Sequence, residues 1–227
     1  MSGRIIKRES EARLPFPVIG KVKCGEKNER GLPRSLDYFV ATGKYASLFQ
    51  NAYDKPNVIQ VVFPSDDASL VCKEEYEFRD TAGKLVADGD GENFRVWSNK
   101  TVSYTRVSTE QYPDIMNMVS SKYPSCEWRV TLTLRFIVPK VRGVMGVWEF
   151  KTKGSASSIP QVRDTFDAML EQNGKVQGVI FDLSVTMAKS QKPNTNSRYP
   201  VVSLIPNESE ANVRLVKECS RQIMIEE

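Results

Sequence analysis

The feature that most constrains the fold is the alternation of apolar and polar residues along 128–138, WRVTLTLRFIV. The apolar residues at every second position are Trp128, Val130, Leu132, Leu134 and Phe136. The positions between them are polar and include Arg129 and Arg135. Because successive side chains of a β strand point to opposite faces, this period of two predicts a half-buried strand. Its other face presents two arginines to solvent or to a ligand.

Shorter segments with strand character are spread along the rest of the chain. They are 16–23, 36–41, 57–63, 74–79, 84–88, 93–97, 101–107, 147–152, 177–188 and 199–205. Helical spacing of apolar residues is found at 44–53, 109–123 and 158–173, with a short helix within 65–72 and a last helix from Asn207. Because the helices do not alternate regularly with the strands, the pattern excludes a doubly wound parallel sheet. It predicts an α+β fold that is strand-rich, with a mainly antiparallel sheet or barrel and three or four helices.

No linker, low-complexity tract or internal repeat divides the 227 residues, a length that suits one large domain or two small ones. We expect a basic N-terminal arm at 1–15, followed by a single compact domain at 16–227. Two intimately packed halves, 16–107 and 108–227, are the alternative.

The segment 158–173 is the clearest helix. Ser158 and Gln161 have the spacing of a capping box at its start. Its apolar stripe consists of Ile159, Val162, Phe166, Met169 and Leu170. Gly174 supplies the C-terminal stop.

The composition excludes several kinds of catalysis. The chain has no histidine, so it has no Ser-His-Asp or Cys-His site and no histidine-ligated zinc. Its four cysteines, Cys24, Cys72, Cys126 and Cys219, are far apart, which indicates reduced, buried or partly buried thiols. The sequence contains no phosphate-binding or nucleophile motif. We therefore predict a protein that is not an enzyme, with no cofactor and no metal.

One acidic stretch, residues 88–92 (DGDGE), has the alternating carboxylates with which a calcium loop begins. Asn93 stands where that loop needs glycine, so a turn after a hairpin strand is the better interpretation. No apolar run approaches the roughly 20 residues that span a bilayer, and the charged N-terminus lacks the apolar core of a signal peptide. We expect a cytoplasmic protein with no membrane partner.

Charge is unevenly distributed along the chain. Residues 1–34 carry nine Lys/Arg and four Glu, residues 66–92 carry nine Asp/Glu and three Lys/Arg, and residues 129–206 carry eleven Lys/Arg and five Asp/Glu. Basic stretches attract phosphate backbones. The alternative is a solvated surface whose charges cancel in three dimensions.

The loop at 188–200 (AKSQKPNTNSRYP) is long, polar and basic, although it joins two strong strands. Lys189, Lys192 and Arg198 supply cations, and Tyr199 supplies a ring for a base to stack on. Such a loop suits a nucleic-acid backbone. The alternative is a flexible hairpin tip that is polar because loops are.

A second basic element, opposed only by Glu149, accompanies the strands at 128–138 and 147–152. Its cations are Arg129, Arg135, Lys140, Arg142, Lys151 and Lys153. If the two strands pair, their outward cations form one surface for nucleic acid. Trp148, between them, is better explained as a core residue than as a platform for bases.

Blocks in the order VIGKVKCGEK, PRSLDYFVATG, VIQVVFPSDD, GDGE, LTLRFIVP, GVWEFKTKGSASS, GKVQGVIFDLSV and SQKPNTNSRYPVVSLIPN run from Val18 to Asn207. In this order the chain resembles the recombination directionality factor-like family of phage and mobile-element proteins. The resemblance implies an accessory protein of DNA recombination that binds a large serine integrase on DNA and favours excision in a bacterial host cell. Some relatives have a cysteine cluster between the GDGE turn and the strand that ends in RFIVP. Between Glu92 and Phe136 this chain has only Cys126, so no zinc site is carried over.

Two other functions remain open. A phage single-stranded DNA-binding replication protein would use the same cations, and a metal-dependent nuclease would need carboxylates that converge in space. The predicted partners are DNA and a serine integrase or another phage replication or recombination protein, with the oligomeric state unknown. The contact surfaces would be the acidic hairpin at 74–90 or the basic loop at 188–200.

Overall fold

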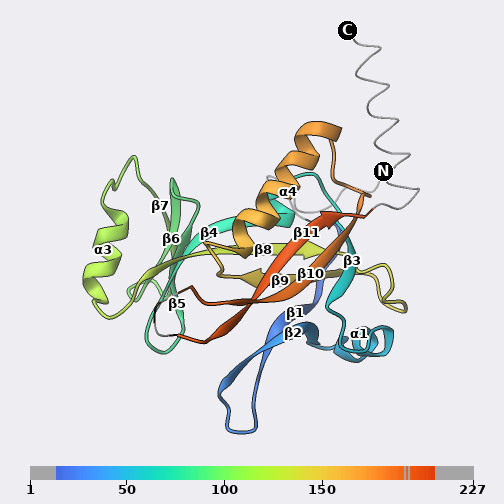
Figure 1. Cartoon of the computed structure of the whole chain (residues 1–227). Helices are drawn as coiled ribbons and strands as arrows, with labels where there is room; N and C mark the ends of the chain where they lie inside the picture. The colour runs from blue at the N-terminus through green and yellow to red at the C-terminus, as the bar shows by residue number, and fades with distance from the viewer. Residues whose placement is uncertain (1–13, 192, 194, 208–227) are drawn as a thin grey trace.

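The computed structural model describes residues 14–191, 193 and 195–207 (Figure 1). The strands are β1 (Val18–Lys27), β2 (Pro33–Thr42), β3 (Val58–Val62), β4 (Cys72–Arg79), β5 (Leu85–Gly89), β6 (Asn93–Ser98), β7 (Ser103–Ser108), β8 (Trp128–Phe136), β9 (Val147–Thr152), β10 (Ile180–Lys189) and β11 (Arg198–Pro206). The helices among the described residues are α1 (Ala46–Ala52), α2 (Ala68–Val71), α3 (Ile115–Lys122) and α4 (Ser158–Asn173).

The strands form two sheets. The larger sheet has eight strands in the order β2-β1-β9-β8-β4-β5-β6-β7, and the smaller has three in the order β11-β10-β3. All pairs are antiparallel except β1 with β9. The predicted strand-rich α+β fold is confirmed, and the barrel alternative is wrong because the sheets are not closed. The eight-stranded sheet instead ends in two edge strands, β2 and β7.

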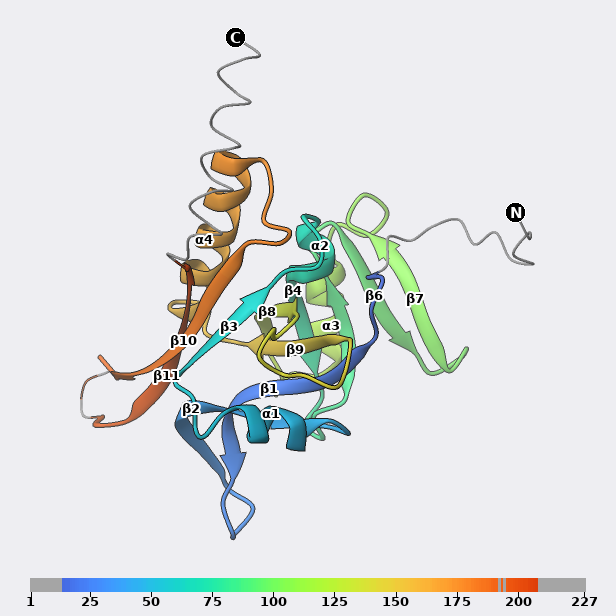
Figure 2. The same ribbon diagram turned by 90° about the vertical axis from the view of Figure 1, so that its right-hand side faces the viewer.

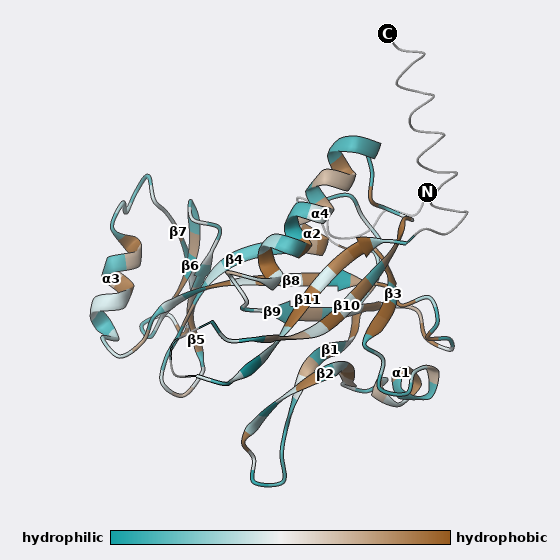
Figure 3. Ribbon diagram, viewed as in Figure 1, coloured by the Kyte–Doolittle hydropathy of each residue, from teal (hydrophilic) through white to brown (hydrophobic). Residues whose placement is uncertain are grey.

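The main core lies where the two sheets and α4 meet. Apolar side chains of this core include Leu134 and Phe136 of β8, Phe166 of α4 and Phe181 of β10, all completely buried. Phe63 contacts the rings of Phe166 and Phe181 edge to face, with centroids 5.1 and 5.4 Å away. Figure 3 shows the hydrophobic colouring gathered on β3, β10 and β11, with hydrophilic residues along the outer turns.

Trp148 belongs to this core, as predicted, with 1% of its surface exposed. Gly20 of the adjacent strand β1 makes room for its ring. A β-carbon at Gly20 would lie 2.5 Å from Cζ3 of Trp148, closer than carbon atoms approach without bonding. The pairing of β1 with β9 therefore depends on glycine at this position.

A second, smaller core lies beneath α3. Phe78 of β4 and Phe94 of β6 both pack on the ring of Trp128, and Ile115 and Val119 of α3 cover them. The indole N–H of Trp128 donates to the carbonyl of Met116, 3.1 Å away. The first residue of β8 thus fixes α3 to the sheet.

Two details of the predicted helices are wrong. The helix predicted at 109–123 begins only at Ile115, because the N–H of Thr109 bonds to the carbonyl of Glu92 and continues the strand end, and Pro113 follows. The capping box at Ser158 does not form, since the residue preceding the helix is Ser157 and it makes no side-chain cap hydrogen bond. The stop at Gly174 is confirmed, with φ of +67°.

The hydroxyl of Ser158 instead accepts the N–H of Val202, and the side-chain oxygen of Gln161 accepts the hydroxyl of Ser203. Ser158 and Gln161 therefore attach α4 to the edge strand β11 and do not cap the helix. The helix predicted from Asn207 and the thiol of Cys219 lie outside the described residues.

Candidate functional site

The outer face of the eight-stranded sheet carries a row of charged residues in register. Direct cross-strand partners are Arg106 of β7, Arg95 of β6, Asp88 of β5, Glu77 of β4 and Arg129 of β8. The row exists because these positions alternate with the apolar residues that face the core. It brings the acidic middle of the sequence against the basic strand β8.

The carboxylates of this row are buried and paired. Asp88, with 3% of its surface exposed, accepts hydrogen bonds from both the Nε and the Nη2 of Arg95. This contact raises the pKa of Arg95 above its usual value. Glu77, 4% exposed, accepts two bonds of 3.1 Å from Arg79 and one from Lys151. Burial alone would raise the pKa of Glu77, but these cations outweigh it and hold the pKa below its usual value.

Two further glutamates form ion pairs with cations of the same face. Glu75 pairs with Lys73 and with Lys151, whose Nζ lies 3.4 Å from its Oε1. Glu149 pairs with Lys21 at 3.3 Å and with Arg135 at 3.4 Å.

Arg135 and Lys151, both predicted to bind nucleic acid, are thus held in ion pairs within the protein. Glu149 is not their only opposing acid, because β4 lies beside β8 and contributes Glu75 and Glu77. The carboxylates of the acidic hairpin are paired in the same way. Glu75, Glu77 and Asp88 form ion pairs with cations of the protein itself.

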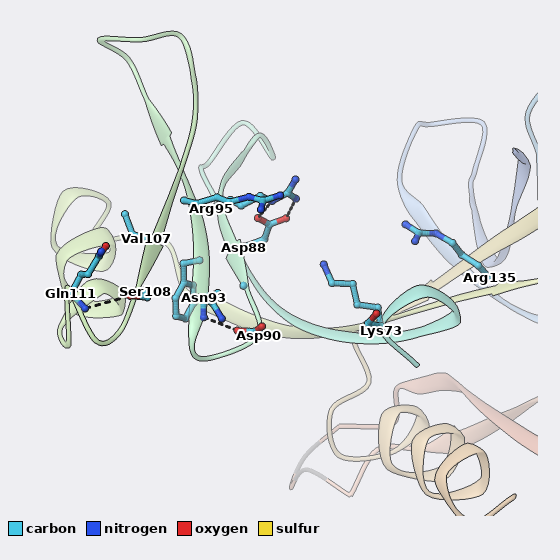
Figure 4. Close-up of a pocket in the computed structure, with 13 residues that line it drawn as sticks. Lys73, Asp88, Asp90, Asn93, Arg95, Val107, Ser108, Gln111 and Arg135 are labelled. Atoms are coloured by element: carbon cyan, nitrogen blue, oxygen red, sulfur yellow. Dashed lines mark hydrogen bonds and ion pairs between the residues drawn. The ribbon is translucent and has the colours of Figure 1, made fainter. Parts of the chain in front are cut away.

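A cleft of about 710 Å³ opens on the charged face, beside Lys73, Asp88 and Arg135 (Figure 4). Its cations include Lys73, Arg95 and Arg135, and each of these has a carboxylate partner, Glu75, Asp88 or Glu149. Figure 4 shows the contact of Arg95 with Asp88 and the side chain of Lys73 projecting toward the same space. Because these charges are largely balanced, the cleft is a weak attractor for anions.

Arg129 and Lys153 lie together at the end of the sheet where β8 begins. Both line a second cleft, of about 480 Å³, with Arg79 and Glu77. Burial lowers the pKa of Lys153, and the nearby cations Arg79, Arg129 and Lys151 lower it further, against the opposing influence of Glu77. Among the described residues, Arg129 and Lys153 have no salt bridge, but Asp80 and Glu127 line the same cleft as Glu77, so the cations of this corner are matched by carboxylates.

Lys140 and Arg142 lie in the turn after β8, at the opposite end of that strand from Arg129. The Nζ of Lys140 stands over the ring of Tyr53, 4.4 Å from its centroid. Two similar contacts occur near α1: Lys44 lies over Tyr45 just before the helix, and Lys55, just after it, lies over Tyr38 of β2. These lysine–tyrosine contacts could not be predicted from the sequence, because the residues come from four separate segments of the chain.

The cations of the 188–200 loop lie at the tip of the β10–β11 hairpin. Lys189 and Arg198 are direct cross-strand partners, and Ala188 pairs with Tyr199. Lys189 and Arg198 are exposed, and neither has a salt bridge within the described part of the chain. Tyr199 has 40% of its surface exposed. Lys192 lies outside the described residues.

The predicted cations therefore occupy three separate places. Figures 1 and 2 together show the β10–β11 hairpin projecting away from the β4–β8–β9 part of the large sheet. The pairing of β8 with β9 is confirmed, but it unites Arg129, Arg135, Lys151 and Lys153 on one face and leaves Lys140 and Arg142 in the turn at its end.

Residues 90–92 form the turn between β5 and β6, which agrees with the preferred interpretation of the stretch 88–92. The Oδ1 of Asp90 accepts the N–H groups of Glu92 and Asn93 at 2.9 and 2.7 Å. Burial would raise the pKa of Asp90, but these backbone hydrogen bonds lower it below the usual value. In the part of the chain that the structure covers, no three His, Cys, Asp or Glu side chains form a group that could hold a metal.

The described thiols, Cys24, Cys72 and Cys126, are free, and burial raises the pKa of Cys24 and of Cys72 to about 12. These two thiols are therefore unreactive at neutral pH. None of the four described helices is long and apolar enough to cross a membrane.

A comparison with protein-family models matches residues 19–207 to the model described as "Gp3-like: Recombination directionality factor-like". The match covers far more than half of the chain. No curated protein and no solved structure matches the sequence.

Proposed function

The chain belongs to the recombination directionality factor-like family, and from this premise we propose that it is a non-enzymatic accessory protein of phage or mobile-element DNA recombination. It binds a serine integrase on DNA and favours excision over integration. Its partners are the integrase and DNA, and its place of action is the bacterial host cell.

The observation that carries the proposal at the level of residues is the exposed pair at the β10–β11 tip. Lys189 and Arg198 face each other directly across the strands. Like charges in this arrangement destabilise a hairpin, and no acid of the described chain relieves them. An anionic partner, such as a DNA backbone or an acidic protein surface, would bind here with a gain from both cations.

The mechanism requires no chemistry by this protein. An accessory protein shifts an equilibrium between two conformations of its partner only by binding them with different affinity. A projecting hairpin suits such a role because it reaches a partner without rearrangement of the two sheets. The clefts on the charged face are not needed for it.

The proposal predicts that reversing the tip charges impairs the switch and leaves the fold intact. The variant is Lys189→Glu, Lys192→Glu and Arg198→Glu in the full chain, and excision by the cognate integrase is the measurement. Because the described tip residues are exposed and bury no core surface, the thermal melting temperature should stay close to that of the unaltered protein. Lys84→Glu, an exposed lysine of the β4–β5 turn, is the control.

Loss of most excision activity in the triple variant alone supports the hairpin as a contact surface. Excision that is equal in the triple variant, the control and the unaltered protein would remove the tip from the proposal.

A second function, single-stranded DNA binding in phage replication, is supported by the lysine–tyrosine contacts around α1. Tyrosine rings beside lysines, such as Tyr53 beside Lys140, supply both the stacking and the cation that a sequence-tolerant DNA site uses. Its distinguishing property is tight, salt-sensitive binding to single strands without an integrase.

A further inference from the structure

Exposed apolar side chains gather on one part of the molecule. Five of the eleven large hydrophobic residues that are exposed in the described chain fall within residues 97–118, on the β6–β7 hairpin, α3 and the loop that joins them. Met118 and Tyr112 each have 46% of their surface exposed. A gathering of this kind on a folded protein marks an interaction site.

A groove of about 410 Å³ lies between the hairpin and α3. Val96 and Val107, from the face of the hairpin that packs toward α3, are half-buried in it, and Ile115 is buried beside them. Tyr112 and Met118 form its exposed rim. Its volume is within the range of about 300–1,000 Å³ that binding clefts have. None of the residues that line the groove belongs to β4, β8, β9, β10 or β11.

The charges around the groove have one sign. Lys100 at the tip of the β6–β7 hairpin and Lys122 at the end of α3 line it, and no Asp or Glu does. Both lysines are exposed, and neither has a salt bridge among the described residues. An apolar floor between two cations is complementary to a segment with apolar side chains on one face and carboxylates at its flanks.

We propose that the groove between the β6–β7 hairpin and α3 is a docking site for an amphipathic, acidic segment of a partner protein. A second copy of this chain is a poor occupant, because a symmetric contact would bring Lys100 and Lys122 against the same cations of the other copy. The inference rests on the proposed function in one respect: the serine integrase is the protein expected to carry the segment. It adds a second contact surface, apolar where the β10–β11 tip is cationic.

The first experiment is site-specific photocrosslinking in the full-length protein. A benzophenone amino acid replaces Met118 in one sample and Met145 in the control, since Met145 is also exposed (69%) but lies in the β8–β9 turn. Each sample is irradiated alone and with the cognate serine integrase, and the crosslinked peptides are identified by mass spectrometry. We expect a crosslink from position 118, and not from 145, to an integrase segment that contains both apolar and acidic residues.

The second experiment measures integrase affinity with the charges reversed, as Lys100→Glu with Lys122→Glu. We expect binding about tenfold weaker than that of the unaltered protein, because both flanking cations then repel the segment. The control, Lys84→Glu, should change the affinity less than about twofold.

The outcomes separate the inference from the proposed function. If the unaltered protein binds the integrase but position 118 crosslinks only to its own chain or to a second copy, the inference is overturned and the proposed function stands. Unchanged affinity in the charge-reversed variant has the same meaning. If the unaltered protein binds no integrase at all, the proposed function fails, and the inference that rests on it fails too.

Discussion

Glu75, Glu77 and Asp88 show how single residues decide which cations of this protein remain available. Each is buried and holds at least one basic side chain of the sheet face. As a result, Arg135 and Lys151 serve the protein's own structure, whereas Lys189 and Arg198 at the hairpin tip do not.

These pairings were beyond prediction from the sequence. Lys151 and Glu77 are 74 residues apart, and only the placing of β8 between β4 and β9 brings them together. Along the chain itself, Glu149 is the only acid within the basic strands, because Glu75 and Glu77 come from the distant strand β4. Trp148 was predictable as a core residue because its apolar surface decides its place regardless of strand order.

Glu77 makes the stability of the fold depend on pH in a defined direction. Its pKa is lower in the folded protein than the usual value of 4.5, so the folded state favours the charged carboxylate. The resulting stabilisation is present above about pH 4.5 and is lost as the pH falls through the lower, folded pKa. The free energy of unfolding, measured by urea denaturation, should therefore decrease in that window.

The variant Glu77→Gln should flatten this part of the pH dependence. At pH 7 it should also reduce the free energy of unfolding by about 1–3 kcal/mol, because Arg79 and Lys151 lose a buried partner but remain partly exposed. Glu29→Gln, in the exposed turn between β1 and β2, is the control. Parallel pH curves for Glu77→Gln and the unaltered protein would show that Glu77 does not carry the effect.

At the scale of elements, the local pattern of apolar residues predicted which helices and strands form, but it did not always predict where they begin. The strand at Val147–Thr152 and the helix at Ser158–Asn173 have the predicted bounds, because both carry a full apolar face with clear stops. The helix α3 is shorter than predicted. The N–H of Thr109 bonds to the carbonyl of Glu92, next to β6, and the N–H of Tyr112 bonds back to Ser108, so only the last part of the apolar pattern forms a helix.

Ser158 was predicted to use its side chain in a hydrogen bond, and it does, but the partner is a strand residue and not the end of its own helix. Its hydroxyl accepts the N–H of Val202. Val202 is buried (2% exposed) in the edge strand β11, so this N–H has no neighbouring strand to bond to on that side. Ser158→Ala leaves this donor unsatisfied and should lower the free energy of unfolding by about 1–3 kcal/mol.

Ser157→Ala is the matched control, because Ser157 precedes the helix without a side-chain cap hydrogen bond. It should change the free energy of unfolding by less than about 0.5 kcal/mol. Equal effects of the two substitutions would mean that the contact between α4 and β11 contributes nothing of its own.

For the whole molecule, the uneven charge along the sequence has two different outcomes. The acidic middle and the basic strands β8 and β9 neutralise each other on the large sheet, which is the alternative that the sequence analysis left open for the charged regions. The hairpin tip and the β8–β9 turn keep their positive charge and lie apart. Separate small basic surfaces of this kind suit contact with an assembly of protein and DNA better than binding of nucleic acid along a single continuous groove.

The order of the strands in the large sheet explains why the sites could not be assembled from the sequence. Strands β4 and β8 are neighbours although some fifty residues separate them, and β1 lies beside β9 from the far half of the chain. Alternation predicts that a strand exists and which face is buried, whereas the neighbour is chosen by packing over the whole chain.

We propose that this protein changes the direction in which a serine integrase recombines DNA. The most direct test is recombination by the cognate integrase on substrates that carry the two hybrid sites, with and without the full-length protein. We predict excision that depends on the protein and rises by at least about tenfold when it is added, together with weak binding to single-stranded DNA alone. An integrase that is active in integration, yet whose excision does not change at any concentration of the protein, would contradict the account.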